Sequence, residues 1–419
     1  MLLVSLALSY IRPVRADFAL RDGDTVVFLG DSITAARGYS RVIENYTLLR
    51  YPARNVHFIN TGKGGDTASG GLARLERDVF SRHATVLTVA FGINDIGWGL
   101  EADAEHKKRY LDAIREIVQR CYRTGVRVFI CSPAITSDAP DHAEQGFLQT
   151  MSDEGLALAK SLGAGTIDVQ RGMREIQRRI VAANALDNNP KNHTVLHADD
   201  GVHLNELGQL AMAYVILKGL GAPADVSSAS IDAAAGRVLR TQGCKVSAIK
   251  KLDENGQFGG VEFTREDEGL PLNLGILGAL NFRFITIPDG LNRYLLAVKY
   301  LPSGQYEIRA ENRLLGTASA QQLSDGLNIS SMTADGWEPG GPWDAQAGIL
   351  KELTDARNSI SMATLLRTNF LPNLPRRQIT DLQTVQTEED LIVLQRQVAR
   401  PFPYHFELLR QTNAPPTPR

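Results

Sequence analysis

A serine follows an apolar run near the start of the chain, in the stretch VVFLGDSITAARGY. Ser32 stands where a strand-like segment ends and a helical segment begins. A hydroxyl in this place can act as a nucleophile when a base removes its proton, and its backbone N–H can point at an oxyanion. Asp31 or Ser32 can equally be the N-cap of the helix, because both residue types are favoured caps. The stretch alone leaves these alternatives open.

Two further stretches carry groups that could serve the same reaction. The first, NTGKGGDTASGG, is rich in glycines, which let a backbone approach a ligand closely. Its spacing matches neither G-x-x-x-x-G-K-S/T nor G-x-G-x-x-G, so it does not favour nucleotide binding. The second, FGINDIG, offers the amide of Asn94. An ordinary surface turn is the alternative for both stretches.

A carboxylate and a histidine lie three residues apart in HADDGVHLNELG. Asp200 could hold the imidazole of His203 in one tautomer and stabilise its charged form, as a general base requires. A metal site is the alternative, because His193, His197 and Asp199 lie close by in the sequence. The stretch lacks the H-E-x-x-H order, which favours the acid–base interpretation.

The elements that would position these groups form a regular alternation between Asp24 and about Ala222. Apolar, β-rich runs are separated by amphipathic segments, such as YLDAIREIVQRCY, with apolar residues at helical spacing. This alternation predicts a doubly wound, three-layer α/β/α domain with a parallel sheet, whose ligands bind at the carboxyl ends of the strands. The expected strands are TVVFLG, NVHFINTG, ATVLTVAFG, VRVFICSP and GTIDV.

The order and content of the four polar stretches resemble the SGNH (GDSL) hydrolase family. GDSIT corresponds to the nucleophile block, GKGGDT to the glycine block, GIND to the G-x-N-D block and DGVH to the D-x-x-H block. The resemblance covers about residues 24–220, with Ile33 standing where the family name has leucine. It implies a flavodoxin-like fold. No G-x-S-x-G elbow occurs, so the chain does not match the usual α/β-hydrolase pattern.

The resemblance also implies a role for each matching residue. Ser32 would be the nucleophile, His203 the general base and then the general acid, and Asp200 the residue that orients His203. The oxyanion hole would consist of the backbone N–H groups of Ser32 and Gly65 and the side-chain amide of Asn94. Gly64 is the alternative to Gly65 as the loop donor. No metal or organic cofactor is implied.

The pattern of residue types changes after Ala222. Short β-rich runs with turn signals follow, and two long helical segments come after them. The expected strands are GRVLRTQG, CKVSAIKKL, GGVEFTRED, NFRFITIP, RYLLAVKYL and QYEIRAENRLLGTAS. The expected organisation is a signal peptide over 1–16, a catalytic domain over 17–222, a β-rich domain over 225–320, a helical segment over 321–405 that packs on the catalytic domain, and a disordered tail over 406–419.

Composition and the N-terminal segment bear on where the protein works. Among 419 residues, 43% are hydrophobic and the formal net charge is −2, so no basic excess points to nucleic acid. MLLVSLALSYI is too short to span a bilayer. With Val14 and Ala16 at the −3 and −1 positions, it predicts a signal peptide cut near Ala16 and a secreted or periplasmic protein. A short helix packed on the domain is the alternative.

We therefore expect a serine esterase whose partner is a small-molecule or polysaccharide ester. An extracellular place favours O-acetyl esters of carbohydrate. The alternatives are a lysophospholipase or thioesterase, or a non-catalytic glycan-binding protein on the same fold. Trp337 and Trp343 could stack on sugars or pack in a core.

Overall fold

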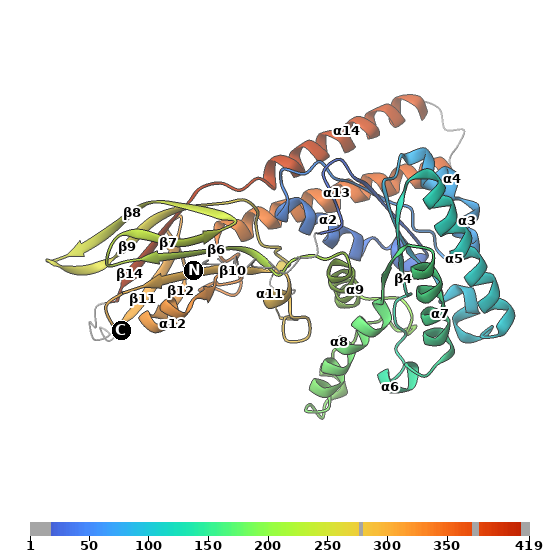
Figure 1. Ribbon diagram of the computed structural model, residues 1–419, viewed down its shortest axis with the longest axis horizontal. Coiled ribbons are helices and arrows are strands. Elements are labelled where there is room, and N and C mark those ends of the chain that lie inside the picture. Colours follow the sequence, from blue (N-terminus) through green and yellow to red (C-terminus); the bar gives the residue numbers. More distant parts are fainter. Residues whose placement is uncertain (1–17, 276–279, 371–376, 412–419) are drawn as a thin grey trace, which may run out of the picture.

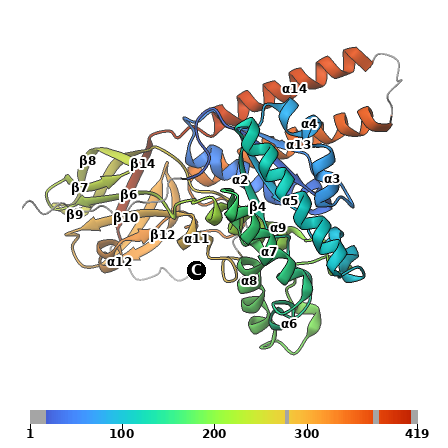
Figure 2. The ribbon, with the colours of Figure 1, turned by 45° about the vertical axis from the view of Figure 1, so that its right-hand side comes forward.

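The computed structural model describes residues 18–275, 280–370 and 377–411. An α/β part and a β-rich part lie side by side, and two long helices extend from the β-rich part along one side of the α/β part (Figures 1 and 2). The signal peptide predicted over residues 1–16 lies outside the described residues. Within the described ranges, no helix is both long and apolar enough to cross a membrane.

The α/β part is built on a five-stranded parallel sheet with the order β2-β1-β3-β4-β5. The chain first adds β2 on one side of β1 and then β3 on the other side, which makes β1 the point where the strand order reverses. This confirms the predicted doubly wound fold, in which such a reversal marks the ligand site. The strands are β1 (Thr25–Gly30), β2 (His57–Asn60), β3 (Val86–Ala90), β4 (Arg127–Cys131) and β5 (Gly165–Ile167).

Helices cover both faces of this sheet, as the nearly continuous apolar strands require. Val26 and Phe28 of β1 join the core under α2, α8 and α9, whereas Val27 and Leu29 join the core under α3, α4, α5 and α7. Successive residues of a strand thus feed opposite layers. The main helices are α2 (Gly38–Arg50), α3 (Ala68–Ala73), α4 (Leu75–Asp78), α5 (Ala104–Thr124), α7 (Phe147–Ser161), α8 (Val169–Asn184) and α9 (Glu206–Gly219).

The β-rich part consists of two sheets. One has the order β13-β10-β6-β7 and the other the order β12-β11-β14-β9-β8. Its core is continuous with the core under α2, α8 and α9, so apolar packing joins the two parts. The strands are β6 (Asp225–Asp232), β7 (Arg237–Gln242), β8 (Cys244–Glu254), β9 (Gln257–Asp267), β10 (Arg293–Lys299), β11 (Gln305–Ala310), β12 (Arg313–Ser319), β13 (Leu327–Asn328) and β14 (Tyr404–Arg410).

Two predictions for this half are wrong. Residues 281–288, predicted as a strand, form turns and the start of α11 (Ile287–Gly290). The predicted tail over 406–419 begins too early, because 406–410 belong to β14, which pairs with both β9 and β11. Phe406 and Leu408 are buried in alternation with half-buried neighbours, as a strand with one core face requires. Residues 412–419 lie outside the described residues.

The helical segment consists of α13 (Pro342–Phe370) and α14 (Arg377–Val398), which lie along one side of the α/β part (Figures 1 and 2). Buried Arg357 of α13 donates to Glu44 of α2 at 2.5 Å. The buried hydroxyl of Thr354 donates to the side chain of Asn45. The C-terminal helices therefore contact the α/β part directly.

Trp343, near the start of α13, and Trp337, just before α13, provide a matched test of the packing between α13 and the β-rich part. Trp343 is fully buried, its ring centroid lies 5.0 Å from that of Tyr294, and its indole N–H donates to Ser330. Trp337 is 82% exposed. Trp343→Ala should lower the free energy of unfolding by about 3–5 kcal/mol through the cavity that it leaves, whereas Trp337→Ala should change it by less than about 0.5 kcal/mol. Urea denaturation measures both, and equal losses would contradict this packing.

Candidate active site

The residues at the end of strand β1 show which side chain caps the helix that follows. Asp31 is the N-cap of the short helix α1 (Ser32–Ala35), and its carboxylate accepts the N–H of Ile33 at 2.9 Å. Burial raises the pKa of Asp31 to about 6. Since Asp31 caps the helix, the hydroxyl of Ser32 is left for other contacts.

The hydroxyl of Ser32 lies against a histidine that is 171 residues away in the chain. His203 Nε2 is 2.8 Å from Ser32 Oγ, and His203 Nδ1 is 2.5 Å from Asp200 Oδ2. The other carboxylate oxygen of Asp200 accepts the backbone N–H groups of Val202 and His203. The hydrogen bond from His203, followed by these backbone bonds, lowers the pKa of Asp200 to about 2. A charged carboxylate thus stands behind the imidazole that faces Ser32.

The glycine loop after β2 lies beside the loop after β3. Gly64 and Gly65 form the corner of a turn that is closed by the Asp66 N–H and the Lys63 carbonyl at 3.2 Å. Gly65 has φ +69°, a conformation that favours glycine. The Asn94 amide donates to the Asp66 carbonyl at 3.0 Å. Asn94 is therefore held next to the glycine turn.

The backbone N–H groups of Ser32 and Gly65 have no acceptor among the described residues. Both are therefore available to an oxygen atom of a ligand.

Sequence analysis missed Trp98, which lies at the same site. Its indole N–H donates to Asn94 Oδ1 at 2.8 Å, which fixes the orientation of that amide. The indole ring lies edge-on to the imidazole of His203 with the centroids 5.6 Å apart, and the side chain is 50% exposed. The backbone of Trp98 has φ +58°, which is rare for a large side chain. The sequence feature that could have identified Trp98 is its position four residues after Asn94.

A buried arginine, also missed, connects the strand that carries Ser32 with the glycine loop. Arg74 donates to the carbonyls of Gly30 at 3.1 Å and Thr61 at 2.6 Å. It also donates to the carboxylate of Asp66 at 2.7 Å and pairs with Asp78. One guanidinium thereby satisfies acceptors on both sides of the candidate site.

Asp95 supports the loop from the other side. Its Oδ1 accepts the N–H of Ala68 at the start of α3, whereas its buried Oδ2 has no partner among the described residues. Burial, together with the nearby charge of Asp31, raises the pKa of Asp95 to about 7. Asp31 and Asp95 thus both stabilise loops at the site.

The side chains proposed for an alternative metal site do not converge. The Nε2 of His193 donates to the carbonyl of Asp187 at 2.9 Å, and the Nε2 of buried His197 donates to the carbonyl of Ile135 at 3.0 Å. Both histidines are therefore occupied by backbone contacts in the structure.

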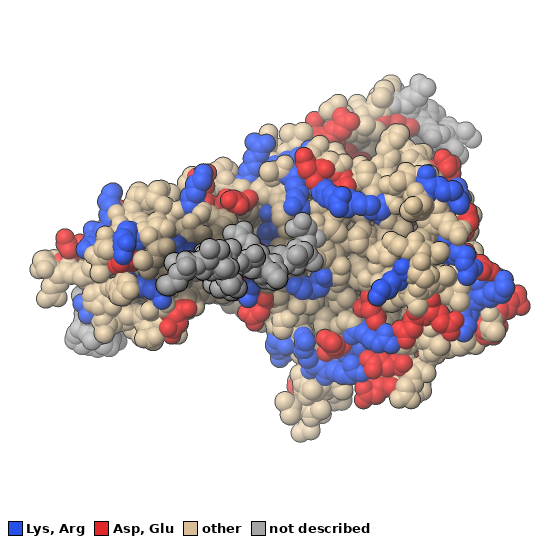
Figure 3. All heavy atoms as spheres, viewed as in Figure 1, with Lys and Arg blue, Asp and Glu red and all other residues tan. Residues whose placement is uncertain are grey.

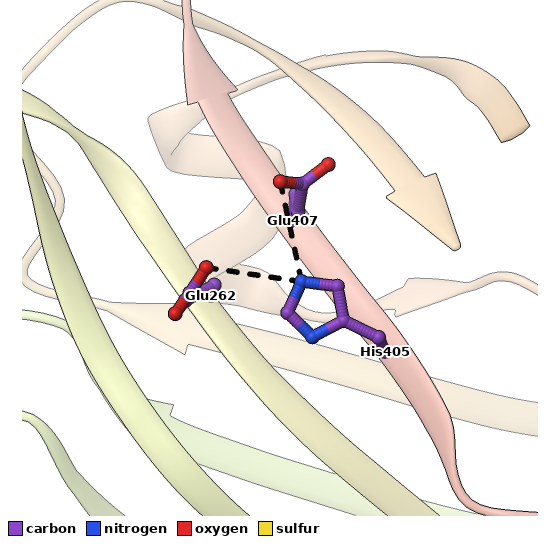
Figure 4. A group of neighbouring side chains, drawn as sticks. All are labelled: Glu262, His405 and Glu407. Atoms are coloured by element: carbon purple, nitrogen blue, oxygen red, sulfur yellow. Dashed lines mark ion pairs between the residues drawn. The ribbon is translucent and has the colours of Figure 1, made fainter. Parts of the chain in front are cut away.

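One group among the described residues brings enough ligand atoms together to hold a metal ion (Figure 4). Glu262 of β9 and His405 and Glu407 of β14 offer atoms within 4.8 Å of one another. Lys250 already pairs with Glu262 at 3.1 Å. This group belongs to the β-rich part and takes no part in the Ser32 site.

Comparison with known proteins places residues 28–211 in a family. The model of the GDSL-like lipase/acylhydrolase family matches residues 28–211. The chain therefore carries a domain of the GDSL-like lipase/acylhydrolase family. The protein is a hydrolase that acts on ester bonds. No curated protein matches the sequence.

Two solved structures are similar to this chain. A gut microbial diltiazem-metabolizing enzyme is 21% identical with a TM-score of 0.80, and the match covers 95% of this chain and 100% of that one. The acetylxylan esterase Axe2 from Geobacillus stearothermophilus is 20% identical with a TM-score of 0.41, over 48% of this chain and 96% of that one. The first likeness thus extends over both the α/β part and the β-rich part.

The raised pKa of Asp95 predicts a pH-dependent stability. Its folded pKa, about 7, exceeds the ordinary value of 3.8, so the folded state holds the proton more tightly and loses stability as the pH rises from 4 to 7. Asp95→Asn, which cannot ionise, should be more stable than the natural protein at pH 8 by up to about 4 kcal/mol. The difference should shrink towards pH 4.

Urea denaturation at both pH values measures this difference. The exposed Asp253, which has no side-chain partner among the described residues, provides the control Asp253→Asn, whose stability should follow that of the natural protein. A pH-independent difference between Asp95→Asn and the natural protein would contradict the assignment.

Proposed function

We propose that the protein is a serine esterase in which Ser32, His203 and Asp200 act as nucleophile, general base and orienting carboxylate. The observation that carries the proposal is the continuous contact from Asp200 through both ring nitrogens of His203 to Ser32 Oγ. Neutral His203 donates from Nδ1 to Asp200 and accepts the Ser32 proton at Nε2. Ser32 then attacks the ester carbonyl, and His203 returns the proton to the leaving alcohol. Water activated by His203 releases the acyl group.

The negative charge that develops on the carbonyl oxygen needs donors in fixed positions. The backbone N–H groups of Ser32 and Gly65 and the amide of Asn94 supply them in this proposal, and each such donor commonly contributes about 10²–10³ in rate. The positive φ of Gly65 and the contact between Asn94 and Asp66 support Gly65 over Gly64 as the loop donor. Trp98 keeps the Asn94 amide turned so that its nitrogen faces the loop.

For the substrate, we propose short-chain, principally O-acetyl, esters of carbohydrate. The half-exposed ring of Trp98 beside His203 supports a substrate with a ring, because sugar and aromatic faces both pack on an indole. The predicted signal peptide supports a location outside the cytoplasm, where acetylated polysaccharides are available. A lipid ester hydrolase remains the second candidate.

Replacing the nucleophile tests the proposal. Ser32→Ala should lower kcat for p-nitrophenyl acetate and for acetylated xylan by at least about 10³-fold, since the attacking atom is lost. Ser161→Ala, an exposed serine on α7, serves as the control and should retain full activity. Acetate release and nitrophenol absorbance provide the measurements.

Two results would contradict the proposal. Equal rates in Ser32→Ala and the natural protein would remove Ser32 as the nucleophile. Hydrolysis of lysophospholipid without acetate release from acetylated xylan would leave the nucleophile in place but overturn the carbohydrate substrate. Diltiazem belongs in the same panel because the enzyme of similar architecture metabolizes it.

A further inference from the structure

A groove follows the outer edge of the parallel sheet. Strand β2 is the edge strand, and helices α13 and α14 lie over its free side, where Arg357 donates to the Phe58 carbonyl at 3.4 Å. The groove between them has a volume of about 1050 Å³. Small-molecule sites commonly have about 300–1,000 Å³. The space can therefore hold an elongated ligand.

Aliphatic side chains line part of the groove. Side chains from the sheet edge and from both helices line it, and Leu365 and Val385 are 43% and 52% exposed. A contiguous apolar surface that stays open to water often marks a ligand-binding groove. The aliphatic side chains are Leu48, Val56, Ile59, Met362, Leu365, Val385 and Ile392.

Every carboxylate that lines the groove already has a cationic partner. Glu44 and Glu388 both accept from Arg357. Asp78 accepts from Arg74 and Arg77. The acidic side chains therefore leave no free negative charge in the groove.

The groove is lined by more basic side chains than carboxylates. Lys63, Arg82 and Arg396 also line the groove, and none has a carboxylate partner in the part of the chain that the structure describes. The Arg396 guanidinium lies 3.3 Å from His57 Nε2, and its buried Nε has no hydrogen-bond partner among the described residues. Burial lowers the pKa of Arg396, and the nearby charge of Asp22 offsets this only in part. The groove thus carries excess positive charge. Over the face seen in Figure 3, by contrast, basic and acidic side chains are mixed.

Two of these three cations, Arg82 and Arg396, lie at one end of the groove, whereas Lys63 lies in the loop at the other end. His57 pairs in register with Thr25, whose carbonyl accepts the N–H of Thr85, so Arg82 and Arg396 both lie near the amino ends of the strands. The opposite end of the groove is formed by the loop over residues 61–64, which leads directly to Gly65. The aliphatic walls lie between a basic end and the loop of the candidate active site.

We propose that this groove binds an amphipathic anion, a single molecule with an elongated apolar body and a carboxylate or phosphate at one end. The apolar body lies along β2 between α13 and α14, and the anionic group meets Arg82 and Arg396. The proposal does not depend on Ser32 chemistry, because it concerns binding along the sheet edge. A ligand of this length would end at the glycine loop, beside the candidate active site.

Isothermal titration of the full chain with decanoate, below its micelle concentration, tests the proposal. Binding should saturate at one molecule per chain, and acetate and neutral octyl glucoside should each bind at least about tenfold more weakly, because each lacks either the apolar body or the charge. Decyl phosphate in a parallel titration distinguishes a phosphate from a carboxylate as the preferred group.

Variants locate the site. Arg82→Glu and Arg396→Glu should weaken decanoate binding at least about tenfold by placing like charges together, and Leu365→Asp should do the same by making the apolar wall polar. Lys160→Glu, an exposed lysine on α7 outside the groove, should leave binding unchanged. Melting temperatures of all variants establish that the fold is retained.

Three results would overturn the proposal. The first is no binding of decanoate or decyl phosphate to the natural protein. The second is binding that appears only above the micelle concentration, which would indicate capture of a lipid surface. The third is binding that none of the groove variants weakens. Ester hydrolysis is not used as a readout, so failure of the proposed esterase mechanism would show separately, in the Ser32→Ala assay.

Discussion

The buried guanidinium of Arg74 holds the candidate active site together. It binds the Gly30 carbonyl, just before Asp31 and Ser32, and the Asp66 carboxylate, just after Gly65. One rigid, planar side chain therefore sets the separation between the strand that carries Ser32 and the loop that carries Gly65. Loss of this cation would leave a buried carboxylate without its partner, which costs far more than an exposed ion pair. The remaining site contacts are built on this separation.

The parallel sheet supplies the second constraint. Its strands all end at one edge, so short loops after β1, β2 and β3 bring Ser32, Gly65 and Asn94 to the same place. His203 arrives from the loop before α9, where Asp200 fixes its ring. Because Asp31 takes over the capping of α1, the Ser32 hydroxyl is left to meet that ring. The loops after β1, β2 and β3 thus contribute one residue each, the loop before α9 contributes two, and the edge of the sheet brings these residues together.

Sequence reasoning reached the features that are local in the chain. The five strands of the parallel sheet are apolar runs, and the four polar stretches follow strands or precede the last helix of the α/β part. The residues that it missed act through distant partners. Arg74 looks like an ordinary helix-surface arginine until Gly30 and Asp66 surround it. Trp98 becomes part of the site only through Asn94 and His203.

Contacts between residues far apart in the chain also explain the two wrong predictions for the C-terminal half. Strand β14 pairs with β9 and β11, which lie about a hundred residues or more earlier, so nothing near residue 406 indicates a sheet. Residues 281–288 have the composition of a strand, but tertiary packing places them in turns and a short helix. The groove beside β2 likewise exists only because α13 and α14, from the far end of the chain, cover the sheet edge.

The central claim is that Ser32 forms the covalent acyl intermediate. Treatment with a fluorophosphonate, which reacts with activated serines, followed by peptide mass mapping measures this directly. The account predicts a single adduct on Ser32 that is lost in His203→Ala, because the hydroxyl is activated only by that imidazole. An adduct on a different residue, or labelling of Ser32 that persists at full rate in His203→Ala, would contradict it.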